Sequence, residues 1–471
     1  MQLETAPMQV GRRGTRFAEL DALEAALAAL PRCRVGGYVT ACGGGTVTAS
    51  GLAGRAGMGD LCLIERRGPG TAPIMFDGAG AMLAEIVGFG DGGVQLLPYE
   101  EAAGIVRGAR VALDRGLAAL RPSLAWRGRV VDAMGRPLDG GPALPAGATS
   151  YPVQARGLAA ERRRGLGARL SLGVRALDLF TPCCDGQRMG IFAGSGVGKS
   201  TLLSMIASGT EAEVLVIGLI GERGRELHDF LEHTLGAEGR ARSVVVVATS
   251  DLPAMMRRRA AHVTLALAEF FRDQGLKALC LIDSVTRYAM ALREICLAAG
   301  EVPTSRGYPP GVFAELPRLL ERAGPGNGRG SITGLFTVLV EGDDPNEPVS
   351  DAVRGILDGH IMLDRLIAER GRFPAVDPLR SLSRTAPGCY APEERALVRE
   401  ARRLLRLHAD MAELIRLGAY RAGSNPELDR AIALVPEIEK VLEQDPQERC
   451  TSEAAFPALA AALGELGTPS Q

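Results

Sequence analysis

The sequence predicts an α/β protein in three parts: a small N-terminal β-barrel, a central domain around a parallel sheet, and a helical C-terminal domain. Three observations lead to this prediction. Short β-favouring runs separated by glycine clusters fill residues 34–99, a pattern typical of a small antiparallel barrel or sandwich. Apolar runs without polar alternation then alternate with helical stretches, which favours a parallel sheet buried on both faces. After Pro392 the composition is helical.

Length and composition support two or three globular domains. The chain has 471 residues, too many for one ordinary domain, and 46% of them are hydrophobic, enough for real cores. The formal net charge is −1, which argues against a mainly nucleic-acid-binding protein. Aromatic residues make up only 4%, too few for extensive base stacking. We therefore expect the barrel to have a structural or assembly role and the chain to have no nucleic-acid partner.

The cysteines and the N-terminus indicate a cytosolic chain with reduced thiols. The nine cysteines are an odd number at irregular spacing, without a CxxC pair, so neither a disulfide framework nor a zinc site is expected. The N-terminus has no apolar signal core, and no uncharged apolar run reaches about 18 residues. The sequence therefore predicts neither a secretion signal nor a transmembrane helix.

The order of these patterns gives the domain limits and the strands. The predicted parts are an N-terminal tail and helix at 1–32, a β-barrel at 33–100, a connector at 101–150, a central α/β domain at 151–389 and a helical domain at 390–471. Barrel strands are expected at Val35–Thr40, Thr46–Ala49, Leu61–Glu65, Met82–Gly88 and Val94–Leu97. Strands of the central sheet are expected at Arg188–Phe192, Val214–Ile220, Ser243–Ala248, Ala278–Ile282 and Gly334–Val340.

An amphipathic helix is expected near the N-terminus. Phe17, Leu20, Leu23, Leu27 and Leu30 follow a helical stripe. Two interpretations remain open from the residues themselves. The helix packs on its own domain, or it docks on a partner protein.

The chemistry centres on residues 186–201, with the sequence GQRMGIFAGSGVGKST. A short apolar strand, a glycine-rich turn and an apolar helix form the context that a phosphate-binding P-loop requires. Lys199 is expected to reach the β- and γ-phosphates, and the Ser200 hydroxyl to hold Mg²⁺. The first glycine position of the strictest pattern holds Ala193, which is still small. The residues expected to bind the nucleotide are Gly194, Ser195, Gly196, Val197, Gly198, Lys199, Ser200 and Thr201.

Two carboxylates follow apolar strands that are suited to the same sheet. Asp283 ends the run Leu279–Asp283, and an Asp at such a strand tip is the usual second anchor of Mg²⁺. Glu222 follows the strand Val214–Ile220 within the segment GERGRE. A carboxylate beside the γ-phosphate can orient and polarise the attacking water, and we assign this role to Glu222.

A third segment supplies an arginine. Residues 374–384 run from PAVD to SLSR and end at Arg384. An arginine given to a neighbouring site can neutralise charge on the transferred phosphoryl group, worth roughly 10³–10⁵ in kcat. We expect Arg384 to act in trans at a subunit interface. Phe373 directly precedes this segment, and its ring is a candidate to cover the adenine.

These motifs resemble the ATPase α/β family, the family of the rotary ATP synthase catalytic subunits. The segments AGSGVGKST, GERGRE, LIDSVTRYAMALRE and PAVDPLRSLS carry the resemblance. Within the family, the chain is most similar to the ATPases of flagellar type III protein export, while those of virulence type III secretion share most of the same stretches. The supporting stretches are GQRMGIFAGSGVGKSTLLSMIA, SRGYPPGVFAELPRLLERAG, VEGDDPNEPVSDAVRGILDGHIMLDR and AYRAGSNPELDRAI.

The resemblance implies a RecA-like central domain that hydrolyses ATP with Mg²⁺. The catalytic and metal-binding positions of the family fall on Lys199, Ser200, Glu222, Arg223, Asp283 and Arg384, and the adenine-covering position on Phe373. The resemblance also implies a homohexamer with nucleotide at subunit interfaces. It further implies a stator-like regulatory protein on the N-terminal helix, and a central stalk protein and chaperone–substrate complexes at the C-terminal helices. The expected location is cytoplasmic, peripheral at the export gate of the inner membrane.

Three alternatives to flagellar export remain open. The first is the ATPase of a virulence injectisome. The second alternative is a hexameric RNA translocase, which also has a ring and a P-loop. It requires a basic, aromatic-rich barrel, and the near-neutral charge and few aromatic residues of this chain argue against it. The third alternative is a ring component that binds nucleotide only for assembly. Such a protein does not need the set Lys199, Glu222, Asp283 and Arg384, so the presence of all four residues argues against it.

Overall fold

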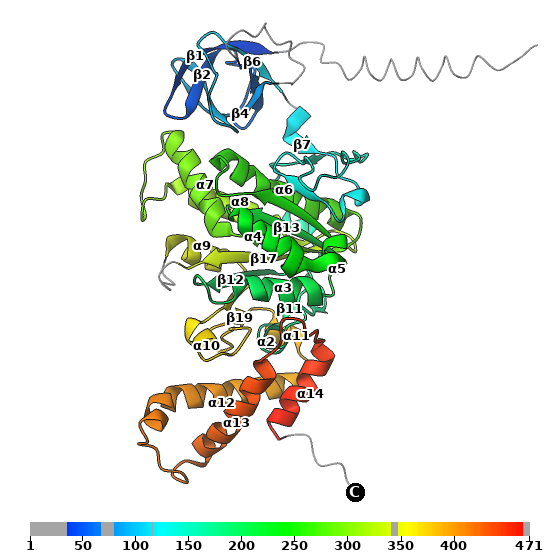
Figure 1. The fold of residues 1–471 in the computed structure, drawn as a ribbon, viewed down its shortest axis with the longest axis vertical. Helices are drawn as coiled ribbons and strands as arrows, with labels where there is room; N and C mark the ends of the chain where they lie inside the picture. Colours follow the sequence, from blue (N-terminus) through cyan, green and yellow to red (C-terminus); the bar gives the residue numbers. More distant parts are fainter. Residues whose placement is uncertain (1–34, 67–79, 115, 341–346, 465–471) are drawn as a thin grey trace, which may run out of the picture. The chain divides into compact units, whose positions relative to one another are not determined.

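A computed structural model describes residues 35–66, 80–114, 116–340 and 347–464. Its residues divide into two compact units. One unit is centred on the N-terminal strands, and the other holds the central sheet together with the C-terminal helices (Figure 1). The amphipathic helix expected over Phe17–Leu30 lies outside the described residues.

The N-terminal unit is a closed β-barrel of six strands. In barrel order the strands are β1, β2, β5, β4, β3 and β6. Their bounds are β1 (Gly36–Gly43), β2 (Thr46–Ser50), β3 (Leu61–Ile64), β4 (Met82–Gly90), β5 (Gly93–Pro98) and β6 (Arg110–Leu113). Inward-facing apolar side chains such as Val47, Ile64 and Leu96 are fully buried in its core. The small barrel predicted from the glycine-punctuated β runs is therefore confirmed.

The barrel extends beyond its predicted limit at residue 100. Strand β6 pairs antiparallel with β1 and with β3, and these pairings close the sheet on itself. Strand β8 (Val130–Asp132) also lies in the expected connector, yet it pairs with β14 (Ser243–Ala248) of the central sheet. Both strands have four residues or fewer. Such short runs show no clear periodicity in sequence, so the sheet to which each strand belongs is visible only from its pairing in the structure.

The central sheet is predominantly parallel. In sheet order its strands are β19, β18, β12, β17, β15, β13, β14 and β8, with β16 paired to β17. The strands after β8 are β12 (Arg188–Ala193), β13 (Val214–Ile220), β14 (Ser243–Ala248), β15 (Lys277–Asp283), β16 (Gly324–Pro325), β17 (Ser331–Leu339), β18 (Gly359–Met362) and β19 (Leu382–Ser383). Strands β12 to β15 and β17 correspond to the central strands expected from the sequence, although β17 ends at Leu339, one residue before its expected end. The parallel sheet is confirmed.

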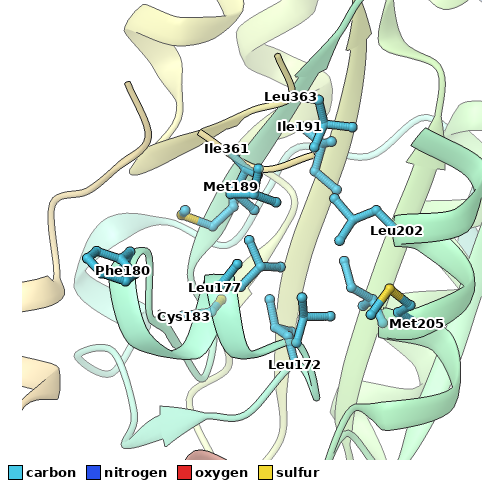
Figure 2. Close-up of a cluster of buried hydrophobic side chains, with 14 of the residues drawn as sticks. Leu172, Leu177, Phe180, Cys183, Met189, Ile191, Leu202, Met205, Ile361 and Leu363 are labelled. Atoms are coloured by element: carbon cyan, nitrogen blue, oxygen red, sulfur yellow. The ribbon is translucent and has the colours of Figure 1, made fainter. Parts of the chain in front are cut away.

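Helices cover both faces of this sheet. Alternate residues of the strands pack on opposite sides: Ile191 contacts the layer of α3, whereas Phe192 packs with α6, α7 and α8. The bounds of these helices are α3 (Lys199–Gly209), α6 (Ala254–Asp273), α7 (Val285–Ala298) and α8 (Pro310–Leu320). Met189 and Ile191 of β12 belong to one buried cluster with Leu202 of α3 and Leu177 of the short helix α2 (Arg175–Phe180), which Figure 2 shows in close-up. This packing holds the strand that leads into the P-loop.

The C-terminal region is helical, as predicted. It consists of α12 (Pro392–Arg416), α13 (Pro426–Leu442) and α14 (Ser452–Ala462), and the last two contact α2. Arg169 forms a bidentate ion pair with Glu394 at 2.8 and 3.1 Å, which ties the start of α12 to the central domain. Within the described ranges, no helix has the length and apolar character needed to cross a membrane.

Shorter elements complete the unit and include one unexpected link. They include α4 (Gly224–Asp229), a π-helical turn (Phe230–Leu235), α5 (Gly236–Ala241), α9 (Pro348–Ile356), α10 (Arg365–Glu369), α11 (Ala386–Cys389) and β11 (Cys183–Cys184). The structure contains a disulfide between Cys184 and Cys389, so the expectation that the cysteines are all thiols is wrong for this pair. The two residues are 205 positions apart. Only the packing of α11 against β11 brings them together, and sequence spacing could not indicate it.

Candidate active site

The P-loop joins β12 to α3 through a backbone that requires glycine. Gly196 and Gly198 have φ angles of +78° and +94°, in the left-handed region that other residues avoid. Helix α3 then begins at Lys199, with Gly198 as its N-cap. Unsatisfied N–H groups and the helix dipole at such a helix start attract anions. The local sequence thus builds a phosphate cradle.

This loop borders a cavity of about 840 Å³. Parallel strands end on the same side of a sheet, and ligands of such sheets bind beyond the carboxyl ends of the strands. Residues directly after β13, at the tip of β15 and at the end of β17 line the cavity together with the P-loop. The lining residues of the P-loop are Gly194, Ser195, Gly196, Gly198, Lys199, Ser200 and Thr201. Val197, also predicted to bind nucleotide, has its side chain in the core at 1% exposure.

Three charged side chains from separate elements meet in the cavity. Lys199 Nζ donates a hydrogen bond to Asp283 Oδ1 at 2.5 Å, and it lies 3.7 Å from Glu222 Oε1. The side chains are 14%, 8% and 16% exposed for Lys199, Asp283 and Glu222 respectively. Low exposure keeps solvent from screening these charges. The structure therefore brings the predicted lysine and both predicted carboxylates into one site.

The pKa of the Glu222 carboxyl is raised toward neutral pH. Burial raises the pKa of Glu222 to about 7, the attraction of Lys199 opposes this shift, and the negative charge of Asp283 adds to it. Its Oε1 atom is buried and has no hydrogen-bond partner among the described residues. A carboxyl with a pKa near the working pH and an unengaged oxygen is suited to accept a hydrogen bond from water and to hold a proton.

Several cationic side chains line the cavity besides Lys199. Arg223, predicted beside Glu222, has a side chain that is 82% exposed. Sequence reasoning missed Arg287 and Arg365. Arg287 follows Asp283 by four residues, in the segment DSVTR, so its place after the strand tip was a usable signal. Arg365 lies in α10, far along the chain, and its Nη2 donates to the Ser195 carbonyl of the P-loop at 3.1 Å.

Phe373 and Arg384 lie outside the set of described residues that line the cavity. Phe373 is near it, because a Cβ placed on Gly198 would lie 3.5 Å from the Phe373 ring carbons. Arg384 is exposed, and its backbone N–H donates to the Asp358 carbonyl at 3.0 Å. Within one chain, Arg384 is therefore not brought to Lys199 and Glu222.

The Arg384 segment is nevertheless tied to the P-loop strand of its own chain. The buried Gln187, directly before β12, donates to Ser383 Oγ at 3.0 Å and accepts from Thr385 Oγ1 at 2.8 Å. Arg188 forms a bidentate ion pair with Asp358, at 3.1 and 3.2 Å. These contacts bracket Arg384 on both sides and fix its backbone relative to β12.

Comparisons with known proteins agree with this architecture. The family profile described as "ATP synthase alpha/beta family, nucleotide-binding domain" matches residues 173–383, and the "T3SS EscN ATPase C-terminal domain" matches residues 390–461. The flagellum-specific ATP synthase of Caulobacter vibrioides is 51% identical over 443 residues, covering 93% of this chain and 98% of the relative.

Solved structures show the same fold. The assembled ATPase EscN from the type III secretion system of enteropathogenic E. coli (EPEC) superimposes with a TM-score of 0.83 at 38% identity, covering 91% of this chain and 100% of EscN. EscN in complex with its central stalk EscO gives a TM-score of 0.81 at 37% identity, again covering 91% and 100%.

A P-loop at the strand ends of a parallel sheet, with a lysine and two carboxylates in its cavity, defines a nucleoside triphosphatase. The identities and coverage then give the family plainly. The chain belongs to the ATP synthase alpha/beta family and is an ATPase.

Proposed function

We propose that this ATPase hydrolyses ATP to energise flagellar type III protein export, by unloading chaperone–substrate complexes during flagellum assembly. The observation that carries the chemistry is the meeting of Lys199, Glu222 and Asp283 in one cavity beside the P-loop. The likeness to the Caulobacter flagellum-specific ATP synthase over nearly both full chains supports the biological assignment.

The chemistry proposed is in-line attack of water on the γ-phosphate. Glu222 accepts a hydrogen bond from this water through its unengaged Oε1 and orients it. Lys199 and the N–H groups at the start of α3 balance the negative charge of the β- and γ-phosphates. Arg223 and Arg287 add positive potential at the cavity wall. Phe373, packed near Gly198, is the proposed cover for the adenine.

The residues present fit a bound Mg²⁺. The Ser200 hydroxyl and the Asp283 carboxylate are hard oxygen donors, both line the cavity, and Mg²⁺ prefers such ligands. We propose that these two side chains hold the metal with the nucleotide. When bound, Mg²⁺ neutralises charge on the β- and γ-phosphate oxygens.

We further propose that the active site is completed by a second copy of the chain. The site lacks an arginine finger from its own Arg384, whose backbone is anchored near Asp358 and Gln187. In a ring, an exposed Arg384 can face the cavity of the next subunit. The assembled state of the related EscN supports a ring, for which we propose six copies.

The proposed partners follow the layout of the chain. The C-terminal helices would face a central stalk protein, as the complex of EscN with EscO suggests, and the chaperone–substrate complexes. The N-terminal residues before the barrel would bind a stator-like regulatory protein. The proposed location is cytoplasmic, peripheral at the export gate of the inner membrane.

Phosphate release by the purified full-length chain tests the enzymatic part. We expect ATP hydrolysis that requires Mg²⁺ and is lost in Lys199→Ala, because the cation that balances the phosphates is removed. Equal rates in Lys199→Ala and in the wild type would contradict the site. In the host, we expect deletion of the gene to abolish filaments, with rescue by the wild type and no rescue by Lys199→Ala.

The likeness to EscN keeps one second candidate, the ATPase of a virulence injectisome. The same deletion strain separates the two functions. Lost filaments with intact effector secretion support the flagellar function, whereas intact filaments with lost secretion would move the chain to the injectisome.

A further inference from the structure

One polar side chain interrupts the otherwise apolar second half of β17. Between Gly334 and Leu339 this strand reads GLFTVL, and Thr337 is 0% exposed. An aliphatic residue would suit such a position, and a buried hydroxyl is costly unless it is hydrogen-bonded. The hydroxyl of Thr337 therefore needs a specific partner.

That partner is Asp283. Thr337 Oγ1 lies 2.6 Å from Asp283 Oδ1 and 3.4 Å from the Ile282 carbonyl. A hydroxyl has a single hydrogen to donate, and the shorter bond to a carboxylate is also the stronger one. Thr337 thus donates to the same oxygen that Lys199 Nζ contacts at 2.5 Å.

The sheet fixes this hydroxyl in place. Strand β17 lies between β12 and β15, with Thr337 opposite Ile191 on one side and Phe336 opposite Ile282 on the other. Thr is β-branched and stiff at χ1, so its hydroxyl has few alternative directions. Both donors converge on Oδ1, and no side chain among the described residues hydrogen-bonds to Asp283 Oδ2.

We propose that Thr337 is a positioning residue that sets the rotation of the Asp283 carboxylate and so reserves Oδ2 for the metal that accompanies the nucleotide. This inference rests on the proposed ATPase site. It adds that the coupling between Mg²⁺ and nucleotide binding depends on a hydroxyl within β17, a strand that gives the site no other polar side chain.

Binding of the fluorescent nucleotide mant-ADP to the full-length chain tests the inference, because it needs no turnover. Affinity is measured with Mg²⁺ and again with EDTA, and the ratio of the two affinities reports the coupling. In Thr337→Val, which replaces the hydroxyl by a methyl group of similar size, we expect this ratio to fall roughly tenfold, the loss typical of a hydrogen bond to a charged group. The affinity in EDTA should stay near that of the wild type.

Three further variants sharpen the test. Thr337→Ser keeps the hydroxyl and should give the wild-type ratio. Thr337→Ala removes the hydroxyl without putting a methyl group in its place, and it should lower the ratio as Thr337→Val does. Thr333→Val is the matched control. Thr333 is also buried in β17, but its hydroxyl accepts from the Gly186 N–H at 2.9 Å, away from Asp283. We expect it to keep the wild-type ratio.

The outcomes separate this inference from the function on which it rests. A wild-type ratio in Thr337→Val and in Thr337→Ala overturns the positioning role, and so does an equal fall in Thr333→Val, which would indicate general damage to the strand. Both results leave the ATPase intact. Binding of mant-ADP that is indifferent both to Mg²⁺ and to Lys199→Ala would instead overturn the proposed nucleotide site.

Discussion

Lys199 Nζ lies 2.5 Å from Asp283 Oδ1 but 3.7 Å from Glu222 Oε1. The lysine is therefore hydrogen-bonded to the first carboxylate and makes only a longer ionic contact with the second. The two carboxylates also differ in their surroundings. Asp283 is hydrogen-bonded by Lys199 and Thr337, whereas burial and the nearby Asp283 charge raise the pKa of Glu222. The raised pKa of Glu222 suits its carboxyl to exchange a proton with water.

Replacement of Glu222 should separate hydrolysis from binding. In Glu222→Gln we expect kcat for ATP to fall at least about 10²-fold, the usual contribution of a positioned base, because the amide cannot take the proton of the water. Nucleotide affinity should remain, since Lys199 and the P-loop are untouched. Phosphate release and mant-ADP binding measure the two effects.

Glu226 supplies the matched control for this variant. It lines the same cavity, but its side chain is 51% exposed. Glu226→Gln should keep most of the turnover. If Glu222→Gln were as active as Glu226→Gln, Glu222 would not be the residue that activates water.

The raised pKa of Glu222 gives a pH dependence with a definite sign. Below about pH 7 this carboxyl is largely protonated and cannot accept the proton, so kcat/KM for ATP should rise with pH and level off above neutrality. The hydrogen bond and the charge of Glu226 also raise the pKa of Glu222. Glu226→Gln should therefore shift the rise of kcat/KM to lower pH. A rise at the same pH in Glu226→Gln and in the wild type would contradict this coupling.

Arg384 should act on a neighbouring copy. We expect Arg384→Ala to lose activity by roughly 10³-fold or more, as arginine fingers do. In Lys199→Ala the P-loop is defective but Arg384 is intact, so mixtures of the two variants contain some interfaces with both groups. Partial recovery of phosphate release on mixing supports action in trans. The absence of recovery in rings shown to be mixed would argue against it.

The same local patterns explain how much could be predicted from the sequence. Strand β13 coincides with its predicted range of Val214–Ile220, because a long apolar run bounded by polar residues has few alternatives. Asp283 and Glu222 could be predicted because Asp283 ends such a strand and Glu222 lies two residues after another. Parallel strands gather these ends at one edge of the sheet.

What the sequence could not show depends on contacts across the fold. Arg365 reaches Ser195 from a position 170 residues away, and no local pattern marks it. Thr337 carried a weaker signal, since it is the polar residue in an apolar run, but its partner became visible only when β17 was placed beside β15. The distance between Arg384 and the cavity follows from tertiary structure in the same way.

Outside the active site, a partly buried ion pair between Arg129 and Asp139 anchors the loop that follows β8. Arg129 donates to Asp139 from Nε at 2.7 Å and from Nη2 at 2.9 Å, and the N–H groups of Val130 and Gly141 donate at 3.1 and 3.0 Å. The Arg129 guanidinium and these N–H groups hold the pKa of Asp139 well below its usual range. The chain's single tryptophan, Trp126, is buried beside this loop and donates to the Pro145 carbonyl at 3.0 Å. Its fluorescence therefore reports the unfolding of this region.

Asp139→Asn should lower the free energy of unfolding of this region by about 2 kcal/mol at pH 7, the usual worth of hydrogen bonds to a charged group. A lowered carboxyl pKa stabilises the fold above the unfolded-state pKa of about 3.9, and this stabilisation is lost as pH falls toward the folded-state value. The difference between variant and wild type should thus be largest at pH 7 and shrink below about pH 4. Urea unfolding followed by Trp126 fluorescence at pH 7, 5 and 3.5 measures it. Asp410→Asn, at an exposed position of α12, is the control and should change the urea midpoint little at any pH. If Asp139→Asn lowered the free energy of unfolding equally at all three pH values, the shape of the side chain, rather than its charge, would account for the effect.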